Sequence, residues 1–344
     1  MKSVRIAAFL IGLTASMPLA WGQGKWVNLA PVPEEHEEMY GASANGKVYA
    51  FGGLIPLWKP AGVVLEYTPA TNTWAKKKPM ALPAHHLALT DYNGKIYIFG
   101  GFVYPKVGDA AWVPINNSWE YDPVNDSWKA LAPMPIARGA AAATVVGDKI
   151  YVVGGAALAP GSTEGYLNFH TRQNVLSTVQ EYDIKTNTWR ERAPMPTPRN
   201  HVAIGTVKGK IYVIGGRVGS AYISMSSDIS LVEVYNPATD MWEAQGSRMP
   251  TARSGVAFGV YNDKIYVAGG EWQDTVVQSA FRVFEAYDPA TDSWETLPPM
   301  VIARHGIASA VAGNRLYAVS GDVQSSGTGI LASTTRVDAF EFTK

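Results

Sequence analysis

Short apolar runs separated by turn residues recur along the chain, and they predict β-strands. One unit reads GAAAATVV (139–146), then a Gly-Asp turn, then KIYVVGG (149–155). Two apolar runs on either side of a two-residue turn predict a tight β-hairpin. VQEY (179–182), a polar turn and a further run that starts at Trp189 follow. The unit therefore predicts four strands.

The unit repeats six times, and three kinds of residue keep the same register. Tryptophan recurs at positions 26, 74, 128, 189, 242 and 294. Gly-Gly pairs recur at 52–53, 100–101, 154–155, 215–216 and 269–270, and Ser320-Gly321 takes the sixth place. Tyrosine stands seven residues before each later tryptophan, at 67, 121, 182, 235 and 287, and Phe340 takes the corresponding sixth place. Because the three registers agree, we interpret the chain as six structural repeats.

The composition of the strands predicts how the six units pack. The first strand of every copy is rich in Gly and Ala, whereas the outer strands carry the repeated Tyr and Trp. Small side chains fit where several sheets converge on an axis, and large aromatic side chains fill the widening gaps between sheets. The pattern predicts an all-β fold, a six-bladed β-propeller with four-stranded antiparallel blades.

The two ends of this pattern predict how the ring closes. KWVNL (25–29) is a tryptophan strand without its three partners, and VDAFEF (337–342) is a third strand without a fourth. We expect the N-terminal strand to complete the last blade, because this pairing removes two open sheet edges.

The repeat resembles a known family. A Gly-Gly pair, then Tyr, then Trp, with MPxxR ahead of the first strand, is similar to the kelch repeat, from Trp26 to Phe342. The resemblance implies a single kelch propeller over residues 23–344. It indicates the fold and says little about function.

The variable part of each repeat lies between its second and third strands. The interval from the Gly pair to the Tyr or Phe ranges from 14 to 27 residues, whereas the other spacings hardly change. In a propeller these connections share one face, and repeat proteins place variable loops on the binding face. Their aromatic residues suit recognition or the packing of loops onto the blades: Trp58, Phe102, Tyr104, Trp112, Tyr166, Phe169, Tyr222 and Trp272.

A second recurring position, the arginine slot, lies sixteen residues before each Gly pair. It holds His36, Ala84, Arg138, Arg199, Arg253 and Arg304. We interpret the four arginines as structural groups that bond backbone carbonyls between blades. The slot and the two residues after it, taken over six copies, hold five of the six histidines. This clustering predicts a shared surface at the mouth of the central channel.

The kelch resemblance implies which of these residues face a ligand: the residue after the slot and the residue after the Gly pair. The first set is Glu37, His85, Gly139, Asn200, Ser254 and His305. The second set is Leu54, Phe102, Ala156, Arg217, Glu271 and Asp322. A protein or glycan recognised at this mouth and at the variable loops is the function that we expect, and such a binding module needs no cofactor.

Two other hypotheses use the same residues. His305, Glu37 and His85 are side chains of the types that bind zinc or a similar metal ion. An exported kelch propeller also resembles the periplasmic sialic-acid epimerases, which implies acid–base chemistry on a sugar by Glu271, Glu37 and His305. Arginine would then hold the substrate's carboxylate.

Composition narrows the class of protein further. With 29 basic residues, 29 acidic residues and no cysteine, the chain lacks the basic surface typical of nucleic-acid binding. The absence of cysteine also excludes the tyrosine–cysteine cofactor of galactose-oxidase-like copper enzymes, which are built on kelch propellers.

The first residues predict export. Lys2 and Arg5 precede an apolar run from Ile6 to about Ala20, and this is typical of a secretory signal peptide over residues 1–22. We expect a periplasmic or secreted monomer with no membrane span after the signal is removed.

Overall fold

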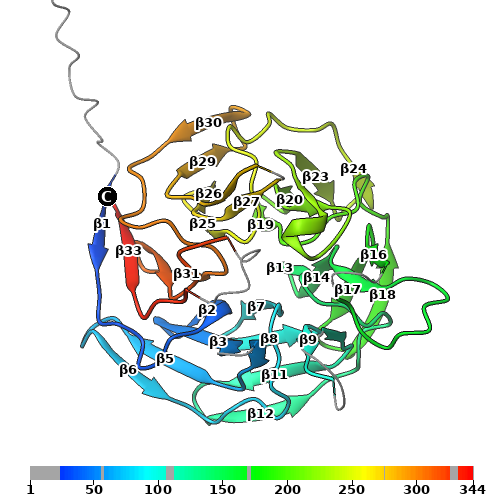
Figure 1. Cartoon of the computed structure of the whole chain (residues 1–344), viewed down its shortest axis with the longest axis horizontal. Coiled ribbons are helices and arrows are strands. Elements are labelled where there is room, and N and C mark those ends of the chain that lie inside the picture. Colours follow the sequence, from blue (N-terminus) through cyan, green and yellow to red (C-terminus); the bar gives the residue numbers. More distant parts are fainter. Residues whose placement is uncertain are drawn as a thin grey trace, which may run out of the picture.

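The computed structural model describes residues 24–55, 58–105, 112–168, 172–274, 276–325 and 332–343. Six β-sheets are arranged around a central axis (Figure 1). The predicted six-bladed propeller is therefore confirmed, whereas the predicted signal peptide at 1–22 lies outside the described residues. Among the described residues, none of the helices has the length and apolar character that crossing a membrane requires.

Each blade is an antiparallel sheet whose first strand lies nearest the axis. Blade one contains β2 (Glu37–Ala44), β3 (Lys47–Ile55), β5 (Val64–Thr68) and β6 (Thr73–Lys76). Blade two contains β7 (Ala88–Tyr92), β8 (Lys95–Phe99), β11 (Ser118–Asp122) and β12 (Ser127–Ala130). Blade three contains β13 (Ala142–Val146), β14 (Lys149–Val153), β17 (Val179–Asp183) and β18 (Thr188–Arg192).

The other three blades follow the same plan. Blade four contains β19 (Ala203–Val207), β20 (Lys210–Ile214), β23 (Val232–Asn236) and β24 (Met241–Trp242). Blade five contains β25 (Ala257–Tyr261), β26 (Lys264–Ala268), β29 (Phe284–Asp288) and β30 (Ser293–Thr296). Blade six contains β31 (Ala308–Ala312), β32 (Arg315–Val319), β33 (Val337–Phe342) and β1 (Gly24–Asn28).

Blade six closes the ring with strands from both ends of the chain. β1 pairs antiparallel with β33, and Trp26 lies opposite Phe340. The two strands lie side by side in Figure 1, one blue and one red. The prediction that the N-terminal strand completes the last blade is confirmed.

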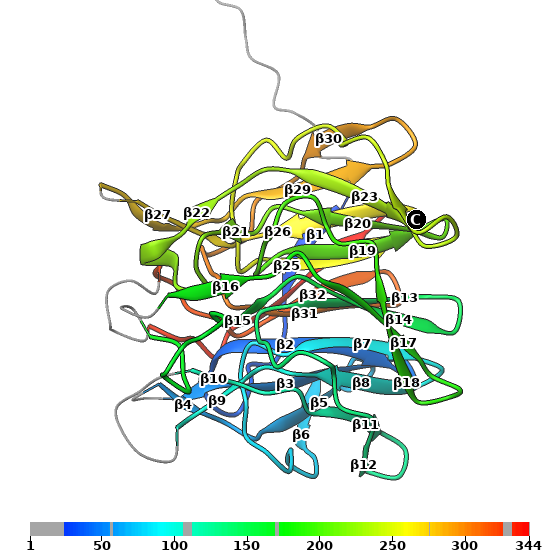
Figure 2. The same cartoon turned by 90° about the vertical axis from the view of Figure 1, so that its right-hand side faces the viewer.

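The connections between second and third strands form extra strands on one face, at the left of Figure 2. β4 (Lys59–Pro60) extends β3. Four hairpins follow in successive blades: β9 (Phe102–Val103) with β10 (Val113–Pro114), β15 (Ala156–Leu158) with β16 (Gln173–Val175), β21 (Arg217–Val218) with β22 (Ser227–Asp228), and β27 (Glu271–Gln273) with β28 (Gln278–Ala280). A 3₁₀ turn, η2 (Ile223–Met225), lies between β21 and β22. We call this side of the molecule the hairpin face.

Hydrophobic clusters and a repeated hydrogen bond hold neighbouring blades together. In one cluster, Tyr49 and Phe51 of blade one pack with Ile98 and Tyr121 of blade two. Each repeated tryptophan also donates its indole N–H to a backbone carbonyl of the preceding blade or of the segment that leaves it. The six bonds run from Trp26 to Pro298, Trp74 to Ala30, Trp128 to Lys78, Trp189 to Ala132, Trp242 to Ala193 and Trp294 to Ser247.

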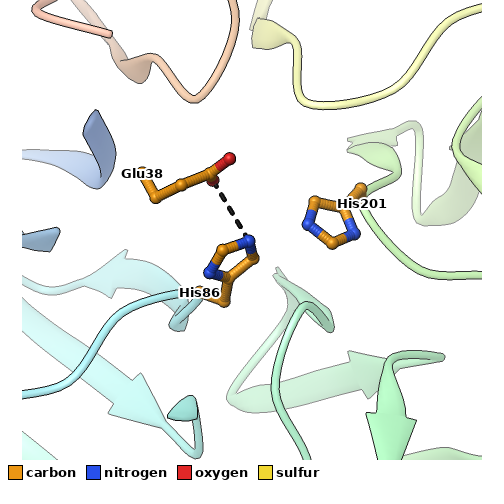
Figure 3. Close-up of side chains that lie close together, drawn as sticks. All are labelled: Glu38, His86 and His201. Carbon is orange, nitrogen blue, oxygen red and sulfur yellow. Dashed lines mark ion pairs between the residues drawn. The ribbon is translucent and has the colours of Figure 1, made fainter. Parts of the chain in front are cut away.

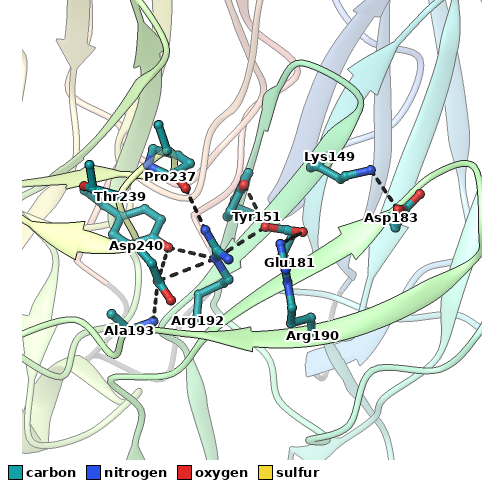
Figure 4. A network of polar contacts seen from close by, with 12 residues as sticks. Lys149, Tyr151, Glu181, Asp183, Arg190, Arg192, Ala193, Pro237, Thr239 and Asp240 are labelled. Atoms are coloured by element: carbon teal, nitrogen blue, oxygen red, sulfur yellow. Dashed lines mark hydrogen bonds and ion pairs between the residues drawn. The ribbon is translucent and has the colours of Figure 1, made fainter.

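An Asn or Asp two residues before the tryptophan completes this joint in five blades. Asp240, for example, accepts a hydrogen bond from the backbone N–H of Ala193 at 2.8 Å (Figure 4) and another from the Tyr235 hydroxyl at 2.5 Å. The equivalent acceptors are Asn72, Asp126, Asn187 and Asp292, and all five residues have φ between +46° and +55°. Asn and Asp tolerate this left-handed backbone better than other residues with a side chain. The combination of Trp and Asn/Asp, which we call the blade clamp, therefore holds both polar backbone groups of one residue in the preceding blade.

We expect the substitution Asn187→Ala to destabilise the protein by roughly 1–3 kcal/mol, because it removes the acceptor for Tyr182 and for the Ala132 N–H and puts Ala in a left-handed conformation. Urea unfolding measures this change. Asn187→Asp is the control, since Asp keeps an acceptor oxygen and tolerates the same φ. Equal loss of stability in both variants would contradict the role given to this residue.

Candidate functional site

The structure pairs, blade by blade, the two sets of residues that the kelch resemblance implies as ligand-facing. The residue after the slot pairs with the residue after the Gly pair at the inner end of each blade. The pairs are Glu37 with Leu54, His85 with Phe102, Gly139 with Ala156, Asn200 with Arg217, Ser254 with Glu271, and His305 with Asp322. Both residues of the Gly pair have positive φ in the first five copies, which bends the second strand at this point.

We expected these residues on a surface at the mouth of the channel, but they are buried. Arg217 is 2% exposed, and Glu37, His85, Asn200, Ser254, His305, Glu271, Asp322 and Phe102 are 0–1% exposed. Trp112, from the connection of blade two, packs against His85, and with Tyr222 of blade four it lies beside Glu37 and Arg217. The sequence therefore indicated where these side chains lie in the ring and did not indicate that they are buried.

Aromatic residues of these connections form a cap over the axis. Trp112 stacks on Tyr222 with ring centroids 4.2 Å apart, and on Phe102 at 5.2 Å. Trp112 also pairs with Leu167 through two backbone hydrogen bonds, and the Tyr222 hydroxyl donates to the Leu167 carbonyl at 3.1 Å. We call Phe102, Trp112, Leu167 and Tyr222 the aromatic cap. Beneath it, the cavity lined by Glu37, Arg217 and the cap residues Trp112 and Tyr222 has a volume of about 10 Å³, which is room for one water molecule.

The second residue after the slot lines the axis itself. In all six blades this residue has positive φ: Glu38, His86, Ala140, His201, Gly255 and Gly306. These six residues form an inner ring around the axis. Four backbone N–H···O bonds join five of them in succession: Ala140 to His86, His201 to Ala140, Gly255 to His201 and Gly306 to Gly255. The left-handed backbone turns the three long side chains of the ring towards one another (Figure 3).

Glu38, His86, His201, Glu271 and His305 form a buried group that we call the axis cluster. His86 Nε2 lies 3.4 Å from Glu38 Oε2, and the rings of His86 and His201 are 4.7 Å apart. His305 Nε2 lies 3.8 Å from Glu38 Oε1 and 3.6 Å from Glu271 Oε2. Two sets of three ligand atoms lie within 4.8 Å of one another: one from Glu38, His86 and His201, and one from Glu38, Glu271 and His305.

The axis cluster contains only one of the three residues that the sequence suggested as metal ligands. His305 belongs to it, whereas Glu37 and His85 lie beside it and are in neither set of three ligand atoms. Glu38, His86 and His201 are among the positions that concentrate histidine, but the kelch resemblance implies that the residue before each of them faces a ligand. The glycines at 255 and 306 were the available signal, because they indicate a left-handed backbone at this position.

Burial controls the protonation of these groups. It lowers the pKa of His85 to about 3. Burial, neighbouring imidazoles and Arg217 lower the pKa of His86 and His201 well below the usual value, so both rings are neutral at neutral pH. Burial also raises the pKa of Glu38, and it raises the pKa of Glu37 well above the usual value, with Asp322 contributing.

The slot arginines are buried and structural, but the expectation that they bond carbonyls between blades is wrong for their side chains. The guanidinium of Arg199 donates to the carbonyls of Gly215 and Leu231 and to Glu233 at 2.8 Å, all in its own blade. Only its backbone reaches blade three, where the Gly155 N–H donates to its carbonyl. The arginine side chain is long enough to reach the second and third strands, so it crosses the end of its own blade.

Each slot arginine has a polar partner on the third strand. The pairs are Arg138 with Gln180, Arg199 with Glu233, Arg253 with Glu285, and Arg304 with Asp338. In blades one and two the slot holds His36 and Ala84, and the equivalent third-strand residues are Leu65 and Trp119. The slot and its partner therefore change together.

Comparisons with known proteins agree with this architecture. The family model described as the KLHDC2/KLHL20/DRC7 kelch-repeats domain matches residues 17–216 and 165–321. Kelch-like protein terF of Aspergillus terreus is 29% identical over 324 residues, which are 91% of this chain and 66% of that protein. Beta-scruin of Limulus polyphemus is 28% identical over 56% of this chain and 20% of its own length. Kelch-like protein 15 of Mus musculus is 26% identical over 74% of this chain and 41% of its own length. The chain thus spans less than two thirds of the length of these relatives.

We expect Arg199→Met alone to destabilise the protein by about 3–5 kcal/mol, because it leaves the buried carboxylate of Glu233 without its cation. The double variant Arg199→Met with Glu233→Leu should recover a large part of this loss, since blades one and two tolerate an apolar third-strand residue. A double-mutant cycle by urea unfolding measures the coupling. Additive losses would contradict a paired role.

Proposed function

The chain belongs to the kelch-repeat family, and from that premise we propose that it is a protein-binding module whose partner docks on the hairpin face. Kelch propellers are generally protein-interaction modules, and loops on a rigid scaffold are common binding surfaces. The hairpin face carries the connections that vary most in length among the six repeats.

The observation that supports this proposal most directly is the distribution of exposed apolar side chains. Seven large hydrophobic residues of the described part are exposed. Five of them lie on connections of the hairpin side: Met225, Val276, Val277, Val301 and Val323. Apolar side chains with a polar surround are typical of protein contact surfaces.

The β27–β28 hairpin carries the most exposed of these residues, Val276, and side-chain hydrogen bonds hold the backbone N–H groups of Val276 and Val277. Val276 is 88% exposed. The carboxylate of Asp274 accepts hydrogen bonds from the backbone N–H groups of Val276 and Val277 and from the Trp272 indole. Residues that hydrogen bonds already hold in place lose less conformational entropy when a partner binds.

A protein partner fits these observations better than a glycan does. Sugars bind by stacking on accessible aromatic rings, but Phe102, Trp112 and Tyr222 are buried in the aromatic cap. A sugar acid at Glu271, as the epimerase hypothesis requires, needs a cavity of several hundred Å³. Glu271 is 0% exposed, and it bonds Arg217 and Ser325.

The double substitution Val276→Ser with Val277→Ser should weaken partner binding at least about tenfold, because it removes exposed apolar contact area. Partners would be identified by cross-linking in the native host, and their affinity would then be measured with purified proteins. The matched control is Val124→Ser, since Val124 is 78% exposed in a turn between third and fourth strands on the opposite face. Loss of binding in the control and not in the hairpin variant would contradict the proposed face.

We also propose that the module acts after export. The basic residues and apolar run of segment 1–22 support this proposal. Intact-mass measurement of the protein from an exporting host should give a chain that begins at Trp21 or Gln23. A chain that retains Met1 would contradict removal of the segment.

A further inference from the structure

The axis cluster contains imidazole nitrogens that are buried without a hydrogen-bond partner. They are Nε2 of His201 and both ring nitrogens of His305. His201 is 6% exposed and His305 is 0% exposed. Buried polar atoms in native proteins are nearly always satisfied, so this arrangement requires a reason.

The proton of His201 can be placed from its neighbour. The Asn200 amide nitrogen donates to the carbonyl of Ser220 at 3.0 Å, so the amide oxygen faces His201 Nδ1, which lies 2.5 Å away. Because this oxygen accepts, His201 Nδ1 carries the proton and Nε2 holds a lone pair. The lone pair points into the axis cluster, where the described protein atoms offer it no proton.

His86 is held in the same way from its other side. Its Nδ1 lies 2.5 Å from Nδ1 of His85, so one proton is shared in this contact. With the proton on His86 Nδ1, its Nε2 lone pair faces the oxygen of Glu38 at 3.4 Å. Metal-binding histidines commonly have their second nitrogen fixed by a neighbouring group in this manner.

The separations suit a cation between these atoms better than direct hydrogen bonds. A charge-assisted N–H···O bond is usually about 2.7–2.9 Å long. Ligand atoms at about 2.1 Å from a tetrahedral zinc ion lie about 3.4 Å from one another, as His86 Nε2 and Glu38 Oε2 do.

Charge balance in the cluster also favours a cation. The carboxylate of Glu271 pairs with the guanidinium of Arg217 at 3.3 Å, whereas that of Glu38 faces imidazole nitrogens of His86 at 3.4 Å and His305 at 3.8 Å. Among the described residues, the Glu38 carboxylate accepts a hydrogen bond from the Tyr40 hydroxyl at 3.3 Å, which is long for a buried carboxylate. A buried anion with such weak compensation is costly unless a positive charge lies close to it.

We propose that the axis cluster is a binding site for one divalent transition-metal ion of the zinc class. Its ligands are His86 Nε2, His201 Nε2 and the carboxylate of Glu38. His305, beside the other oxygen of Glu38, supplies a fourth ligand or binds a water on the metal. Two imidazoles and one carboxylate form a ligand set that zinc and iron(II) both accept.

An ion can reach this site along the axis from the face opposite the hairpins. A cavity of about 50 Å³ begins at Glu38, His201, Gly255 and Gly306. It shares lining residues, such as Gly41 and Ser309, with a wider cavity that continues along the same first strands past Ser43 and Thr144. The aromatic cap closes the other end.

The test is zinc binding by the whole chain after chelator treatment and dialysis, measured by titration calorimetry. The wild type should bind about one zinc ion with a dissociation constant below about 1 µM. His201→Gln and Glu38→Gln should each weaken zinc binding at least about 100-fold. Asn200 positions His201 and does not contact the metal, so Asn200→Leu should weaken zinc binding by about 10–100-fold. The matched control is His36→Gln: His36 is 1% exposed, neither of its ring nitrogens has a hydrogen-bond partner, and it lies outside the cluster. Its affinity for zinc should equal that of the wild type.

A second measurement does not depend on the folding of any variant. Crystals of the unmodified chain soaked in zinc should give an anomalous-difference peak between His86, His201 and Glu38. Substitution by cobalt(II) should give the visible absorption of a tetrahedral nitrogen–oxygen site. Water in place of the peak, a peak elsewhere, or unchanged affinity in both His201→Gln and Glu38→Gln would overturn the proposal.

Discussion

The blade clamp is the interaction on which the rest of this structure depends. Each blade is a small twisted sheet that could meet its neighbour at many angles. The clamp holds the N–H and the carbonyl of one residue in the preceding blade, so it specifies both distance and orientation. Repeated around the ring, this constraint makes the first strands converge and brings residues of five blades together at the axis. The axis cluster is thus a product of contacts made at the outer rim.

The fold could be predicted because one physical requirement repeats in the sequence. Large aromatic residues at the rim and small residues at the axis recur with constant spacing, and only a closed ring satisfies both. The clamp was harder to see, because its Asn or Asp resembles an ordinary turn residue. The partners of the slot arginines were missed for a different reason. Gln180 and Glu233 indicate a role only when they are compared with Leu65, in one of the two copies that have no slot arginine.

For the candidate site, the positions of the residues could be predicted from the sequence, whereas their burial and the direction of their side chains could not. The positions near the axis follow from the repeat register. Their burial depends on the aromatic cap, which is built from connections of three blades with different lengths and has no repeat of its own. The identity of the inward-facing residue depends on the sign of a backbone dihedral angle. That angle follows from the sequence where glycine occupies the position, and it does not where Glu38 or His86 does.

The joint between blades five and six has a consequence for how the ring forms. Pro298 has no N–H, and Phe340 has no hydroxyl, so the blade clamp is reduced here to the indole bond of Trp26, which spans 272 residues of sequence. Packing of Trp26 and Phe340 against Phe284 replaces the missing polar contacts. Contacts between residues so distant in sequence form late in folding, because they carry the largest loop-closure entropy. Apolar packing of Trp26 and Phe340 on Phe284 suits this last step, because apolar contacts can form before the directional hydrogen bond of the Trp26 indole. We call these contacts the apolar seam. The same seam is where we expect the folded ring to open first and exchange its amide protons.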